Sequence, residues 1–132
     1  MENSNRLITT EDKLAVQAAF AAATRAGDVT AMEAISDPDA VVWHNYDDVA
    51  VPGTQANRTL RWLHRTMPDV AWDDVAVLAT PEGFVWRAVL TGTAPDGPVR
   101  AHTCMVVTLS DTGNVQRVDE YLDPAALHPL TA

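Results

Sequence analysis

The sequence has few of the residues that typify disulfide-bonded proteins or proteins that bind nucleic acid. It contains a single cysteine, Cys104, so an internal disulfide is impossible, and a lone cysteine in an apolar segment usually packs as a small hydrophobic group. Only nine of the 132 residues are lysine or arginine, against 18 aspartate and glutamate, and the net charge is −9. Nucleic acid and anionic membrane surfaces are therefore not expected partners.

Long hydrophobic runs are also missing. No apolar stretch approaches the roughly 20 residues that a membrane-spanning helix needs, and residues 1–6 lack the apolar region of a secretion signal. We therefore expect a cytoplasmic protein. No glycine-rich phosphate loop, dinucleotide-binding pattern or closely spaced histidine pair occurs, so the sequence predicts neither a cofactor nor a bound metal.

Apolar residues make up 47% of the chain, which suits one folded domain over residues 1–132. Helical spacing and caps predict three helices, followed by strands separated by turn signals. The predicted helices are 9–25, 30–35 and 54–66, and the predicted strands are 41–46, 70–79, 83–92, 99–109 and 115–122. This order predicts an α+β fold with a strongly bent, mostly antiparallel sheet. Three N-terminal helices would close the sheet into a cone around an apolar pocket.

Two strands carry a polar residue among hydrophobic neighbours. Because side chains alternate along a strand, His44 shares a face with Val42 and Tyr46, and Glu120 shares a face with its apolar neighbours in 115–122. Histidine exchanges protons near neutral pH, and an apolar setting favours the protonated form of a carboxyl group. His44 and Glu120 are therefore the predicted catalytic pair, pointing into one cavity with side-chain ends about 5–9 Å apart, close enough to share a small substrate.

Several segments, taken in order, resemble one family. They are Ala26-Gly27-Asp28, Asp39-Ala40-Val41-Val42-Trp43-His44, the third predicted helix, Asp111-Thr112-Gly113-Asn114-Val115 and Asp119-Glu120-Tyr121-Leu122-Asp123. Together they are similar to the nuclear transport factor 2-like superfamily, in the SnoaL-like branch, over nearly the whole chain. That branch resembles polyketide cyclases, ketosteroid isomerases and limonene epoxide hydrolases. The resemblance implies the cone-shaped fold and a homodimer.

The resemblance also assigns positions in the site. The general base of ketosteroid isomerases falls on His44, while their two oxyanion-binding positions fall on Phe20 and Met105. One catalytic aspartate of limonene epoxide hydrolases falls on Glu120. Their arginine and second aspartate fall on Trp86 and Ala88. Neither complete catalytic set is present, so the resemblance does not assign either reaction.

Other side chains are predicted to contact the substrate because of the face or element on which they lie. These residues are Phe20, Tyr46, Trp62, Trp86, Met105 and Leu122. We expect a small, cofactor-independent enzyme that performs acid–base chemistry on a hydrophobic small molecule, as an isomerase, cyclase, dehydratase or epoxide hydrolase. Two alternatives stay open: a non-catalytic module that binds small molecules, and an accessory dimerisation domain. Apolar residues on both faces of the strands predict a homodimer through the convex face of the sheet.

Overall fold

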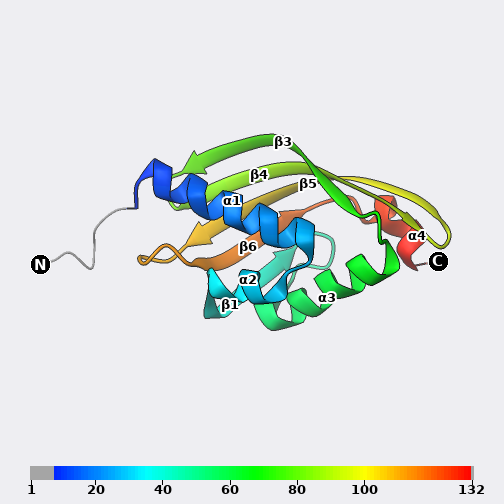
Figure 1. Cartoon of the computed structure of the whole chain (residues 1–132), viewed down its shortest axis with the longest axis horizontal. Coiled ribbons are helices and arrows are strands. Elements are labelled where there is room, and N and C mark those ends of the chain that lie inside the picture. Colours follow the sequence, from blue (N-terminus) through cyan, green and yellow to red (C-terminus); the bar gives the residue numbers. More distant parts are fainter. Residues whose placement is uncertain (1–7, 132) are drawn as a thin grey trace, which may run out of the picture.

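A computed structural model describes residues 8–131 and places the helices against one curved sheet (Figure 1). The elements in chain order are α1 (Thr10–Ala26), α2 (Val29–Ala34), β1 (Ser36–His44), β2 (Val49–Pro52), α3 (Gly53–Thr66), β3 (Ala71–Thr80), β4 (Gly83–Ala94), β5 (Gly97–Leu109), β6 (Val115–Tyr121), the 3₁₀ helix η1 (Pro124–Leu127) and α4 (His128–Thr131). The predicted α+β class is confirmed.

The sheet has six strands in the order β2-β1-β6-β5-β4-β3. Strands β3 to β6 are joined by short connections and pair antiparallel with their sequence neighbours, as their turn signals predict. Strand β1 instead pairs parallel with β6, and β2 pairs antiparallel with β1 at the edge. The first strand of the chain therefore lies beside the last.

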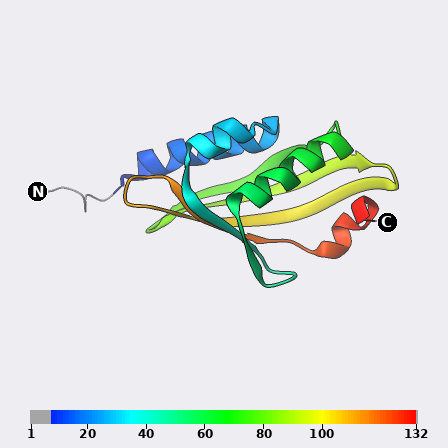
Figure 2. The same cartoon turned by 90° about the horizontal axis from the view of Figure 1, so that it is seen from below.

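Helices α1, α2 and α3 lie on the same side of the sheet (Figure 2). Helix α1 begins at a capping box in which the Thr9 side chain accepts from the Asp12 amide, and it ends at Gly27 in the left-handed region (φ 64°). A side chain at position 27 would also meet the ring of His64, because a Cβ there would lie 2.7 Å from His64 Cδ2. The C-terminus of α1 is thereby packed closely against α3.

The hydrophobic core lies between α1 and the inner face of the strands. Its largest fully buried side chains are Phe84, Trp86 and Val107, while Met67 is equally buried in a second cluster with Ala94 and Val99. The opposite face carries exposed apolar residues, including Leu78 at 57% and Tyr121 at 44% exposure. Within the described residues, no helix is long and apolar enough to cross a membrane.

One strand begins earlier than the sequence predicts, and three short elements were not predicted. Strand β1 begins at Ser36, before the predicted start, although Pro38 lies in this segment and indicated a turn. The Val115 amide donates to the Ile35 carbonyl at 2.7 Å, so pairing with β6 recruits residues that local sequence does not favour as strand. The short edge strand β2, η1 and α4 were not predicted.

Candidate functional site

His44 and Glu120 form a direct side-chain contact. They occupy paired positions on the parallel strands β1 and β6, and His44 Nε2 lies 2.8 Å from Glu120 Oε1. Their side chains are 21% and 17% exposed, so each retains limited contact with solvent. The predicted gap for a substrate between the two side chains is therefore wrong, because the strands pair them directly, and a bound molecule would have to approach the pair from one side.

The backbone around the pair fixes its register. The Asn45 amide donates to the Glu120 carbonyl at 3.2 Å. The Asn45 side-chain oxygen accepts from the Leu122 amide at 3.0 Å. These bonds continue the pairing of β1 and β6 beyond the last residue of β1, so the strand end that carries the pair is held on both sides. A shift of one residue would turn Glu120 to the opposite face.

The electrostatic surroundings favour a positive charge on His44. Its pKa is raised above 6.5, first by the hydrogen bond to Glu120 and also by the negative charges of Glu120 and Asp47, while burial acts in the opposite direction. With Nε2 donating to the carboxylate, Nδ1 is the ring nitrogen left to exchange a proton. The pair therefore resembles the histidine and carboxylate of a catalytic triad, in which the carboxylate orients the imidazole and stabilises its positive charge.

Tyr46 lies beside the histidine. The two ring centroids are 5.0 Å apart with an interplanar angle of 32°. Burial raises the pKa of the Tyr46 phenol, and the negative charges of Glu120 and Asp47 raise it further. The phenol therefore stays protonated and can donate a hydrogen bond. Among residues 8–131, the Tyr46 hydroxyl has no hydrogen-bond partner within the protein.

The pair lies in the wall of a cavity of about 750 Å³. Its apolar lining comes from the inner face of the sheet, from α1 and α3, and from the C-terminal segment. The residues predicted for the site that line it are Phe20, His44, Tyr46, Trp62, Met105, Glu120 and Leu122. Trp62 is 38% exposed. A cavity of this size can hold a drug-sized molecule.

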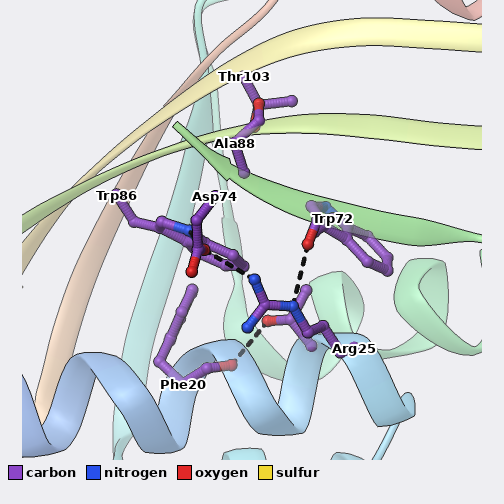
Figure 3. Close-up of polar contacts among 8 residues, drawn as sticks. Phe20, Arg25, Trp72, Asp74, Trp86, Ala88 and Thr103 are labelled. Carbon is purple, nitrogen blue, oxygen red and sulfur yellow. Dashed lines mark hydrogen bonds and ion pairs between the residues drawn. The ribbon is translucent and has the colours of Figure 1, made fainter. Parts of the chain in front are cut away.

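Trp86 lies outside the cavity lining, which corrects the prediction that it contacts a substrate. Its side chain is fully buried and its indole N–H donates to Asp74 Oδ1 at 2.7 Å (Figure 3). Phe20 packs edge-on against the indole, and the Arg25 guanidinium lies 5.4 Å from the ring centroid. Strand parity placed Trp86 on the correct face, but helix α1 covers that part of the sheet.

Arg25 joins α1 to β3 in the same cluster. Its Nε donates to the Trp72 carbonyl at 3.0 Å and its Nη2 to Asp74 Oδ1 at 2.7 Å (Figure 3). The bonds from Trp86 and Arg25 lower the pKa of Asp74. Both charged side chains are substantially exposed, so the cluster orients the helix on the sheet rather than forming a buried reaction centre.

Other lining residues were not singled out from the sequence. Trp72 of β3 is 4% exposed and stacks near His64, whose Nε2 lies 3.0 Å from the Thr24 carbonyl oxygen. Leu127 and Leu130 add the C-terminal segment to the wall. The spacing of these two leucines could have indicated an apolar face that packs on the cavity. Pro124 and Pro129 interrupt the segment, so the pattern was not recognised.

Within residues 8–131, no three histidine, cysteine, aspartate or glutamate side chains lie close enough together to hold a metal ion. Cys104 is partly buried on β5, and its side chain forms no disulfide.

Most of the sequence matches the model of a known protein family. Residues 16–118 match the model of the SnoaL-like domain. The chain belongs to this SnoaL-like family, as the resemblance in its sequence indicated.

Solved structures share the fold at low sequence identity. PrhC from Penicillium brasilianum superposes with a TM-score of 0.80 at 12% identity, covering 97% of this chain and 87% of PrhC. IdmH from Streptomyces antibioticus, a candidate polyketide cyclase, gives 0.76 at 17% identity, covering 91% and 99%. An LEH-like epoxide hydrolase from M. tuberculosis gives 0.72 at 17%, covering 92% and 91%. No curated protein matches the sequence.

Proposed function

We propose that this protein is a small enzyme that moves protons on a hydrophobic small molecule bound in its cavity, without a cofactor. The observation that carries the proposal is the 2.8 Å contact between His44 Nε2 and Glu120 Oε1 in the wall of a largely apolar cavity. A histidine oriented by a carboxylate, beside space for a ligand, is an arrangement suited to general acid–base catalysis.

His44 is the group that exchanges the proton in this proposal. Neutral His44 removes a proton from a carbon next to a substrate carbonyl through Nδ1, and the C–H electron pair moves into an enolate. Glu120 accepts the hydrogen bond from Nε2–H and stabilises the imidazolium that results. If the substrate carries a β,γ double bond, the enolate is a dienolate, and the imidazolium returns the proton to its γ carbon, which moves the double bond into conjugation and is an isomerisation. If the enolate carbon attacks a second carbonyl of the same molecule, the proton goes to the new alkoxide, which is a cyclisation.

Tyr46 supplies the hydrogen bond to the substrate oxygen in this scheme. The oxyanion-binding positions of ketosteroid isomerases fall on the apolar residues Phe20 and Met105 in this chain, so neither can donate. The Tyr46 phenol, whose pKa is raised, lies beside His44 and lines the cavity. Its O–H would donate to the oxygen on which negative charge develops.

The proposal is tested with a panel of hydrophobic cyclic ketones, diketones and epoxides. Deuterium incorporation from D₂O reports proton transfer at carbon, and ¹⁸O incorporation from labelled water reports epoxide opening. We expect deuterium exchange on at least one carbonyl compound, and a loss of about 10²–10⁴-fold in His44→Gln. Thr108→Val, on the opposite sheet face, is the matched control. Ligand binding without exchange in the wild-type protein would contradict the proposal and favour a binding module.

We also propose that the chain forms a homodimer through the convex face of the sheet. The exposed apolar residues on this face, such as Leu78 and Tyr121, support the proposal, together with the partly exposed Val85 and Val106 on neighbouring strands. Contiguous apolar surface of this kind commonly marks a protein interface. Light scattering at micromolar concentration measures the mass directly.

A further inference from the structure

The cavity has a one-sided distribution of charge. Among the residues that line it are four carboxylates, Glu33, Asp37, Asp47 and Glu120, but no lysine or arginine. His44 is the only lining residue that can become cationic near neutral pH, and Glu120 already balances it. The rest of the chain adds to the same sign, because the whole protein carries a net charge of −9.

Helix α3 also keeps its positively charged residues out of the cavity lining. Its arginines recur at positions 58, 61 and 65, which is one stripe along a helix, and none of them lines the cavity. The residues of α3 that do line it are neutral. They include the amides Gln55 and Asn57, together with hydroxyl and apolar side chains. The helix therefore presents uncharged donors and acceptors to the cavity, with its cations on another stripe.

None of the other lysines and arginines in residues 8–131 lines the cavity, and three of them form contacts away from it. Lys13 Nζ donates to the Thr80 carbonyl at 2.7 Å, at the far end of α1. Arg25 is paired with Asp74 and Arg117 with Asp119. A carboxylate, phosphate or sulfate on a bound molecule would therefore enter a cavity with negative groups in its lining and without a guanidinium or ammonium partner. Removing such an anion from water without compensation is strongly unfavourable.

We infer that the ligand of this cavity is a hydrophobic molecule without an anionic group, whose polar atoms are hydroxyl or carbonyl oxygens. This inference rests on the proposed function for the identity of the site, and it adds the substrate class. It excludes phosphorylated molecules, free acids and thioesters of coenzyme A. A substrate that is synthesised while covalently attached to a carrier would first have to be released from that carrier by a preceding reaction. The released molecule would have to be uncharged, or be esterified, before this protein could bind it.

The test uses three probes that share one tricyclic skeleton: dehydroabietinol, dehydroabietylamine and dehydroabietate. Binding is followed by the fluorescence of Trp62 and Trp72, both in the lining. A unit charge at about 10 Å in a water-like dielectric changes affinity by about twofold. Three unbalanced carboxylates and the desolvation of the ligand therefore predict that the alcohol binds at least about tenfold more tightly than the carboxylate at low ionic strength. The amine is expected to bind no more weakly than the alcohol.

Added salt and amino-acid substitutions show how much of the weak binding of dehydroabietate is caused by the carboxylates of the lining. In 1 M salt the gap between alcohol and carboxylate should narrow, because rim charges are screened. The triple variant Glu33→Gln, Asp37→Asn, Asp47→Asn should narrow it at low salt, whereas Asp96→Asn, outside the lining, should leave it unchanged. The salt series uses the wild-type protein, so the inference stays testable if the triple variant fails to fold.

Two results would overturn the inference. One is dehydroabietate binding as tightly as the alcohol at low salt, and the other is failure of both uncharged and cationic probes to bind. The same titrations in His44→Gln separate this inference from the proposed function, because the order of affinities does not require proton transfer. Discrimination against the carboxylate without any exchange activity would contradict the proposed catalysis alone.

Discussion

The contact between His44 and Glu120 predicts a coupling energy that depends on pH. The perturbation is a double-mutant cycle comprising the wild-type protein, His44→Asn, Glu120→Gln and the double variant. The 2.8 Å distance and the limited exposure of both side chains indicate a charge-assisted hydrogen bond that is partly shielded from solvent. Hydrogen bonds to charged groups contribute about 1.5–3 kcal/mol. Because the amide introduced by Glu120→Gln could still accept a neutral hydrogen bond, we expect a measured coupling near the lower end of this range, about 1.5 kcal/mol.

The sign of the pH dependence follows from the direction of the pKa shift. The pKa of His44 is raised in the folded protein above the value of 6.5 for an unperturbed histidine. The stabilisation is therefore fully present below about pH 6.5, and it is lost as the pH rises through the raised pKa of the folded state. The coupling energy should be larger at pH 6 than at pH 9.

Urea unfolding of the four proteins at both pH values measures this coupling. With an m-value of about 1.5 kcal/mol/M, a coupling of about 1.5 kcal/mol corresponds to roughly 1 M in the unfolding midpoint. Thr108→Val is again the control, because residue 108 lies on the opposite face of β5 from Met105. A coupling below about 0.5 kcal/mol at pH 6, or one that grows towards pH 9, would refute the reasoning from the contact and its electrostatics.

Three further predictions concern the scaffold and its assembly. Trp86→Phe removes the hydrogen bond to Asp74 and should lower the free energy of unfolding by about 1–3 kcal/mol, while retaining ligand affinity because residue 86 lies outside the cavity; a selective loss of ligand binding with unchanged stability would contradict this placement. Gly83→Ala should destabilise the fold by about 3 kcal/mol or more in thermal or urea unfolding, because its Cβ would clash with the Val107 carbonyl oxygen; an unchanged midpoint would disprove that close approach. Light scattering should give the mass of a dimer for the wild-type protein, and Val106→Glu on the convex face should shift it towards the monomer; a monomeric wild-type protein refutes the homodimer.

Strand periodicity was sufficient to identify the two residues of the pair. His44 and Glu120 lie on strands whose boundaries near these residues are set by apolar alternation, so parity gave their faces without knowledge of the pairing. The direct contact between them was not predictable, because it depends on the parallel register of two strands 76 positions apart. That register is stabilised by Asn45, whose role appears only when both strands are in place.

The wrong prediction for Trp86 and the lining residues that were not predicted have a different physical origin. Parity gives the face of a residue but not its place along a curved sheet, and Trp86 therefore has the correct face and the wrong surroundings. The wall supplied by Leu127 and Leu130 comes from short helical turns whose structure depends on packing against β5 rather than on local propensity. The neutral face of α3 could have been found from its arginine spacing, since positions 58, 61 and 65 mark the stripe turned away from the cavity.

The parallel pairing of β1 with β6 has a consequence for synthesis of the protein on the ribosome. His44 is translated early, but its carboxylate partner follows 76 residues later, after every other strand of the sheet. Until that last strand has emerged from the exit tunnel, β1 lacks the neighbour that separates it from β5. The contact between His44 and Glu120 can therefore form only after the last strand has been made, and nascent or truncated chains that stop before Glu120 contain the histidine without its carboxylate partner.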